Sequence, residues 1–78
     1  MTKLYPVSGK KMIKILACLG FNLLRVKGSH NIFLNPETKK TATVPIHANE
    51  VLGIGLLKSI LRDIDLSAEE YEKLRNEV

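Results

Sequence analysis

Apolar residues recur at helical spacing in two stretches of the 78-residue chain. Each stretch places them at positions i, i+3, i+4 and i+7, which form one face of a helix. They are Met12, Ile15, Leu16 and Leu19 in the first stretch, and Leu57, Ile60, Leu61 and Ile64 in the second. Ser8 can cap the start of the first helix, and Gly20 favours its end. The pattern therefore predicts two amphipathic helices that each bury one side.

Between these helices the chain switches to the alternation of apolar and polar residues that is typical of strands. Three runs show it, at residues 21–26, 29–35 and 41–47. Residues 35–38, Asn-Pro-Glu-Thr, are turn formers that separate the last two runs. Pro45 cannot donate a backbone hydrogen bond, so we expect it at a sheet edge or at the end of pairing. The pattern predicts three consecutive antiparallel strands.

Strict alternation also assigns side chains to the two faces of the sheet. It groups Phe21, Leu23 and Arg25 on one side of the first strand, and His30, Ile32 and Leu34 on one side of the second. A third, shorter helix is predicted over residues 67–78, because Ser67 to Glu70 match a capping box.

The element order predicts an α+β fold. We expect a small two-layer domain in α-β-β-β-α order, in which two helices cover one face of a three-stranded antiparallel sheet. At this length residues 1–78 should form a single domain.

Charge is distributed unevenly along the chain. The net charge is +4, yet residues 1–50 carry eight Lys or Arg against two acidic residues, and residues 51–78 carry four against six. The half that holds the strands is therefore positive, which favours a polyanionic partner, with nucleic acid ahead of a membrane. A basic surface that serves only solubility is the alternative. The single cysteine, Cys18, excludes an internal disulfide and is expected to be a small buried or half-buried filler.

Gly28, Ser29 and His30 stand together at the start of the second predicted strand. Gly28 can adopt a positive φ, so a tight turn would aim the side chain that follows two positions later. Histidine has an unperturbed pKa of ~6.5, which lets it both take and give a proton near neutrality. His30 is therefore the first candidate for catalysis. The alternative is a histidine at the rim of the core, beside Ile32 and Leu34.

Three segments resemble the HicA family of bacterial and archaeal toxins: KGSHNIF at 27–33, VPIH at 44–47 and GLLKSILRD at 55–63. The resemblance covers roughly residues 8–66. It implies the layout of the double-stranded-RNA-binding fold and the activity of an mRNA interferase from a type II toxin–antitoxin pair. Such a toxin is an endoribonuclease that cleaves mRNA, arrests translation and is neutralised by a HicB-type antitoxin.

The resemblance also implies roles for individual residues. The family's catalytic histidine falls on His30, and its second common histidine falls on His47. One departure is visible at Leu56, where many relatives carry a threonine whose hydroxyl could cap the second helix or touch phosphate.

Further candidate RNA contacts are basic or polar. Lys10 and Lys11 lie in the first turn of the first helix, where cations and free N–H groups together favour an anion. Four more cations are expected on strands or turns around the histidine, although each is also explained as a solvated charge: Arg25, Lys27, Lys39 and Lys40. Ser29, after Gly28, can bond a phosphate or cap the turn. His47 can be a second acid or base, an RNA contact or a strand-end residue.

RNA carries its own nucleophile, the 2′-hydroxyl, so a nuclease of this kind needs only to move protons and stabilise the phosphate. We therefore expect no required metal and no other cofactor. His30 and His47, in separate strands without a nearby carboxylate pair, make a poor metal site. No apolar run approaches ~18 residues, so we expect a cytoplasmic protein without a membrane partner. The rival interpretation is a non-catalytic RNA-binding module of the same fold, which would grip duplex RNA by its shape.

Overall fold

The structure, a computed structural model, describes residues 3–47 and 50–78 and confirms the predicted α+β order. Its elements are α1 (Gly9–Cys18), β1 (Asn22–Lys27), β2 (His30–Leu34), β3 (Thr41–Pro45), α2 (Ile54–Asp63) and α3 (Ala68–Glu77). Strand and helix ends differ from the predicted ones by a residue or two, which is ordinary at element boundaries. Within the described ranges, no helix is long and apolar enough to cross a membrane.

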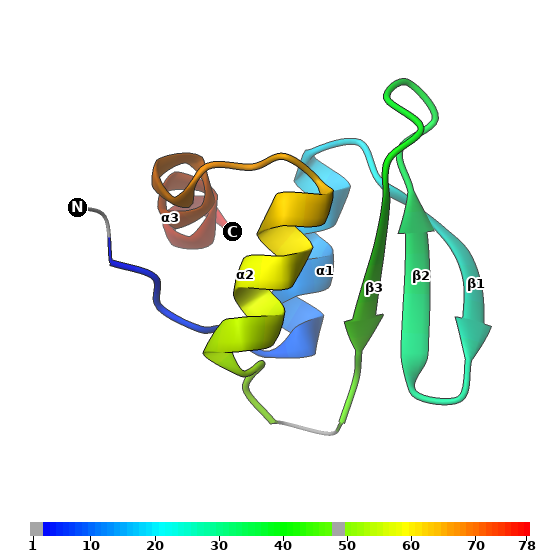
Figure 1. Cartoon of the computed structure of the whole chain (residues 1–78), viewed down its shortest axis with the longest axis horizontal. Helices are drawn as coiled ribbons and strands as arrows, with labels where there is room; N and C mark the ends of the chain where they lie inside the picture. Colours follow the sequence, from blue (N-terminus) through cyan, green and yellow to red (C-terminus); the bar gives the residue numbers. More distant parts are fainter. Residues whose placement is uncertain (1–2, 48–49) are drawn as a thin grey trace.

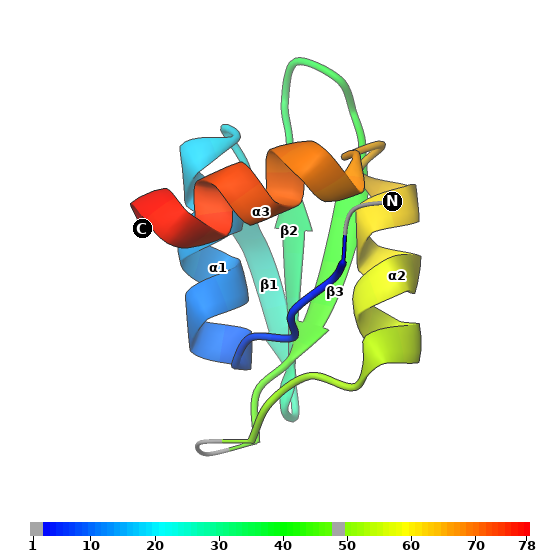
Figure 2. The ribbon, with the colours of Figure 1, turned by 90° about the vertical axis from the view of Figure 1, so that its left-hand side faces the viewer.

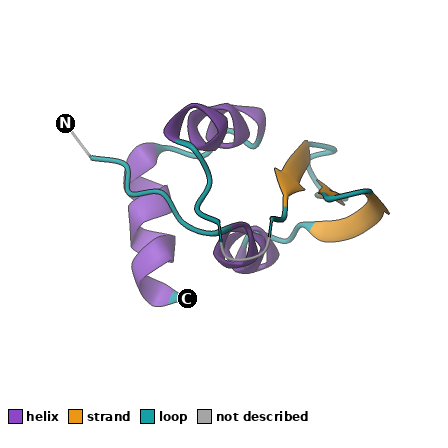
Figure 3. Ribbon diagram, turned by 90° about the horizontal axis from the view of Figure 1, so that it is seen from below, coloured by secondary structure: helices purple, strands orange, loops and turns teal. Residues whose placement is uncertain are grey.

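The three strands form one antiparallel sheet in the order β1-β2-β3 (Figure 1). Helices α1 and α2 lie on one face of the sheet, as predicted, and both contact it through β3. Helix α3 packs against α1 on the side away from the sheet, and so adds a further layer (Figure 2). Seen from below, the strands lie to one side of all three helices (Figure 3). The opposite face of the sheet carries no helix in the described chain.

The predicted helical stripes form the core. Met12, Ile15 and Leu16 of α1 are fully buried, as is Leu57 of α2. The side chain of Ser8 caps α1 by accepting a hydrogen bond from the backbone N–H of Lys11 at 3.2 Å, as expected for an N-cap serine. The helical spacing therefore identified both the helices and the sides that they bury.

A β-bulge in β1 changes the predicted faces of the sheet. Leu23 pairs with Phe33, whose side chain is buried, but Arg25 pairs with Ile32, and Leu24 lies between them without a partner in register. The expectation that Leu23 and Arg25 share a face is therefore wrong, because one extra residue reverses the alternation beyond it. Arg25, as the partner of Ile32, lies on the face of the sheet that points away from the helices, and the bulge places Leu23 on the opposite face with Phe33.

Strand β1 is an open edge of the sheet. Leu23, Leu24 and Val26 are each 55% exposed, because the helices contact the sheet chiefly at β3, two strands away. Cys18 is exposed as well, so the expectation of a buried filler is wrong. It lies in the last turn of α1, off the stripe that faces the core.

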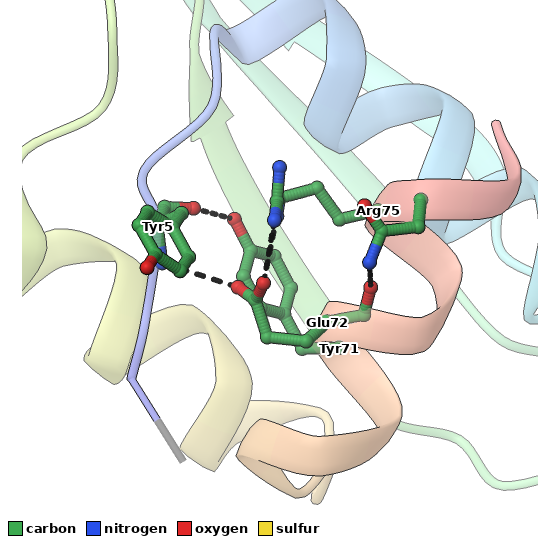
Figure 4. Close-up of polar contacts among 5 residues, drawn as sticks. Tyr5, Tyr71, Glu72 and Arg75 are labelled. Atoms are coloured by element: carbon green, nitrogen blue, oxygen red, sulfur yellow. Dashed lines mark hydrogen bonds and ion pairs between the residues drawn. The ribbon is translucent and has the colours of Figure 1, made fainter.

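The segment before α1 is fastened to α3 by a group of contacts that we call the terminal clasp: Tyr5, Tyr71, Glu72 and Arg75 (Figure 4). The Tyr71 hydroxyl donates to the Tyr5 carbonyl at 2.6 Å, and the Tyr5 N–H donates to a Glu72 carboxylate oxygen at 3.1 Å. The Arg75 guanidinium donates twice to Glu72, at 2.7 and 2.9 Å, and lies 5.0 Å from the centre of the Tyr5 ring. The backbone and ring of Tyr5 therefore form one network of contacts with three side chains of α3.

The clasp changes the acidity of two of its members. Burial of Tyr71 raises the pKa of its hydroxyl to about 12, and the nearby Glu72 carboxylate contributes to the same shift. The hydrogen bonds from Arg75 hold the pKa of Glu72 below its ordinary value. At neutral pH the Tyr71 hydroxyl is therefore a donor and Glu72 an ionised acceptor, as the network requires.

Replacing Tyr71 by Phe should lower the free energy of unfolding by ~0.5 to 1.5 kcal/mol, the usual worth of such a hydrogen bond. The ring stays in place, but the Tyr5 carbonyl loses its donor. Denaturation in urea, followed by circular dichroism, measures the change. Tyr5→Phe is the matched control, because the hydrogen bonds of Tyr5 in the clasp use its backbone and not its hydroxyl. Equal destabilisation in both variants would contradict this account of the clasp.

Candidate functional site

His30 lies at one end of the sheet, directly after a two-residue turn. Lys27 and His30 pair across β1 and β2, with Gly28 and Ser29 between them. Gly28 has a φ of 61°, as predicted, and a positive φ at the first turn residue alone is the pattern of a type II′ hairpin. The turn thus makes His30 the first residue of β2 and sets the direction of its side chain.

The imidazole of His30 is accessible. His30 is exposed, whereas Phe33, on the opposite face of β2, is 5% exposed and part of the core. Ile32 and Leu34 share the face of His30, but this face points away from α1 and α2. The interpretation of His30 as a histidine at the rim of the core is therefore wrong. A polymer can approach it from the open side of the sheet.

The open face of the sheet around His30 is positively charged. Lys27, the direct partner of His30, and Arg25, two positions before Lys27 in β1, lie on the same face. None of the strand residues that the register places on this face is acidic. They are Asn22, Arg25, Lys27, His30, Ile32, Leu34, Thr41, Thr43 and Pro45. The charge around the imidazole thus favours an anionic ligand.

The end of β3 holds this turn in place. Pro45 is the strand partner of His30, and the Ile46 N–H donates to the Ser29 carbonyl at 2.8 Å. The first residue of α1, Gly9, packs against the same segment so closely that a Cβ there would lie 2.8 Å from the Pro45 carbonyl oxygen. Helix α1 therefore supports, through β3, the strand end that carries the imidazole.

A small open pocket adjoins this end of the sheet. Its volume is about 230 Å³, and it lies between the end of β3 and the start of α2. The described residues that line it are Pro45, His47, Glu50, Val51, Leu52, Gly53 and Leu56. Pro45 belongs both to this lining and to the strand pair with His30, so the pocket adjoins the strand end that carries His30. His47, the second predicted histidine, is exposed and belongs to the pocket.

The remaining predicted cations do not gather at His30. Lys39 and Lys40 lie in the loop between β2 and β3, beyond Leu34, which is itself about 13 Å from His30 along β2 at the usual strand rise. Lys40 forms a 3.3 Å ion pair with Asp65. Lys11 donates from its ammonium to the Val78 carbonyl at 2.6 Å, on the α3 side of the molecule. Lys10 is exposed beside Gly9, at the same end of the molecule as the turn.

A comparison with models of protein families shows which family the chain belongs to. A model described as the HicA toxin of bacterial toxin–antitoxin systems matches residues 9–66 of the 78-residue chain. The chain belongs to the HicA toxin family. A search of the curated proteins finds no match. Because HicA toxins belong to toxin–antitoxin systems, the family implies that this protein has an antitoxin partner.

Sequence reasoning missed parts of the site in this HicA toxin. Gly9 stands in the first turn of a helix, where glycine is less favourable than alanine, and that mismatch was the available signal for a close contact. Glu50 carries no comparable signal, and Leu56 was noted only for the hydroxyl that it lacks, because only the fold brings the two residues to the pocket beside Pro45. Among residues 3–47 and 50–78 there is no group of three or more His, Cys, Asp or Glu side chains that could hold a metal ion.

Replacing Gly9 by Ala should lower the free energy of unfolding by ~1 to 3 kcal/mol, as overpacking does. The new Cβ would lie 2.7 Å from Ile46 Cδ1 and 2.8 Å from a backbone oxygen that cannot rotate away. Urea denaturation measures the loss. Gly55→Ala is the matched control in α2, since its Cβ would meet nothing within 4 Å and helix propensity should improve. A Gly9 variant as stable as the wild type would contradict the close contact.

Proposed function

We propose that this HicA toxin is an mRNA interferase, an endoribonuclease that cleaves mRNA in the cytoplasm and arrests translation. A HicB-type antitoxin neutralises it. The observation that carries the proposal is the exposed imidazole of His30, aimed by a tight turn onto an open face of the sheet beside Lys27 and Arg25. The family match supports it, because the match includes this whole segment.

The proposed reaction begins at the 2′-hydroxyl of the RNA. Its oxygen attacks the adjacent phosphorus, the bond from phosphorus to the 5′-oxygen breaks, and a 2′,3′-cyclic phosphate forms. His30 takes the 2′ proton as general base or delivers a proton to the departing 5′-oxygen as general acid. Lys27 and Arg25 stabilise the negative charge that builds on the phosphate oxygens. The RNA itself provides the nucleophile, so this reaction needs no metal ion or cofactor.

We assign the other predicted contacts by their distance from His30. Gly28 and Ser29, in the turn, and Lys10, at the start of α1, are candidates for RNA contacts close to the cut, as is His47 in the pocket. Lys39 and Lys40 would meet the RNA farther along the chain, and Lys40 is partly engaged by Asp65. Lys11 is the weakest of these candidates, because its ammonium already donates to the Val78 carbonyl.

His30→Ala should reduce the rate of RNA cleavage at least ~100-fold, the lower end of what general acid–base catalysis contributes. It should also abolish growth arrest on expression. The side chain is exposed, so the free energy of unfolding should change by less than ~0.5 kcal/mol. Cleavage of a labelled RNA, growth curves and urea denaturation measure the three effects. A His30→Ala variant that folds and remains fully toxic would remove the mechanism.

A substrate with 2′-deoxyribose at the cut position should resist cleavage, because the attacking hydroxyl is missing. The matched all-ribose RNA should be cleaved equally well with and without an excess of EDTA. Product analysis by gel electrophoresis distinguishes these outcomes and detects the cyclic phosphate. Cleavage that stops in EDTA would point to a metal nuclease. RNA that is bound but left intact by the wild type would point to the RNA-binding module instead.

A further inference from the structure

The pocket beside Pro45 adjoins the place where the RNA would be cut. Directly paired residues of antiparallel strands have Cα atoms ~4.5 to 5.5 Å apart, and Pro45 is paired with His30. A nucleotide held at His30 therefore has a neighbour in the RNA chain that can reach the pocket. This inference rests on the proposed function, since it concerns the same substrate.

The size of the pocket fits part of a polymer. Its volume of about 230 Å³ lies below the ~300 to 1,000 Å³ of pockets that enclose a drug-sized molecule. Such a space suits one planar ring system and not a whole nucleotide with its sugar and phosphate. An RNA chain that crosses the open face would place single bases at this position.

The walls of the pocket suit the flat face of a base. Pro45, Val51 and Leu56 present apolar surface, and His47 adds an aromatic ring. Val51 is 61% exposed and Leu56 is 38% exposed, so a base would cover apolar surface that water now contacts. Stacking of unpaired bases on ring side chains is the usual way in which proteins hold single-stranded RNA. Leucine at position 56 provides this apolar wall.

The carboxylate of Glu50 makes the pocket more suitable for a base of the RNA than for a phosphate. It is the acidic residue among those that line the pocket, and it would repel a phosphate placed there. Phosphates are instead attracted to Lys27 and Arg25 on the open face. A carboxylate accepts hydrogen bonds from N–H groups on the edge of a base, as Glu and Asp do from the amino group of cytosine. The charges thus separate a phosphate position from a base position.

We propose that this pocket is a base subsite next to the cut, and that Glu50 makes it prefer a base with an exocyclic amino group. Guanine, adenine and cytosine carry such a group, and uracil does not. Guanine offers two adjacent N–H donors and should fit best. The subsite gives the toxin a sequence preference at one side of the cleaved bond.

The experiment compares cleavage of RNAs that differ only in the base on either side of one cut position. When the base that enters the pocket is uracil, the wild type should cleave the RNA at least about five-fold more slowly than when it is guanine, adenine or cytosine. This factor is the lower end of the discrimination that a good base contact gives. Glu50→Gln should cleave all four variants at nearly equal rates, because an amide both accepts and donates. Glu37→Gln, in the loop at the far end of the sheet, is the matched control and should keep the preference.

A binding measurement separates failure of the subsite from failure of the proposed function. In the His30→Ala background, fluorescence anisotropy with short labelled oligonucleotides of cytosine, adenine or uracil should show weaker binding of the uracil chain. Adding Glu50→Gln should remove that difference. Cleavage by the wild type without any base preference would overturn the subsite alone. Base-selective binding by a wild-type protein that never cleaves RNA would overturn the proposed function and leave the subsite standing.

Discussion

The close approach of α1 to the end of β3 is the contact on which the arrangement of the site depends. A Cβ atom at Gly9 would lie 2.8 Å from the carbonyl oxygen of Pro45, so only a residue without a side chain permits this approach. The same short segment then pairs with His30 through Pro45 and with Ser29 through Ile46. The buried side of α1 therefore supports a turn that itself lies at the surface.

The open face of the sheet follows from how small the core is. Two helices bury Phe33, Ala42 and Val44 on one face, and within residues 3–47 and 50–78 no helix covers the other. A domain of this size cannot enclose a large substrate. It can instead present a positive strand face with a shallow pocket at one end, an arrangement that accommodates a long charged polymer better than a small metabolite.

The sequence predicted what local spacing determines. The helices follow from apolar residues at helical spacing, and the turn before His30 follows from Gly28, whose φ is positive as expected. The bulge at Leu24 could not be predicted, because nothing in the alternation marks an extra residue, and it places Leu23 on the face of the sheet opposite to Arg25 and His30. The pocket escaped prediction as well, because it joins segments that local patterns do not relate.

The terminal clasp lies in the parts of the chain that flank the family match at residues 9–66. Tyr5 contacts residues 66 and 67 positions later in the sequence, so the clasp closes nearly the whole chain into a ring. Closing so long a ring carries an entropic penalty that the local helices avoid. Since α3 is synthesised after the other described elements, Tyr5 finds its partners only once α3 has left the ribosome exit tunnel. The nascent toxin thus forms the clasp only after the whole region of the family match has been synthesised.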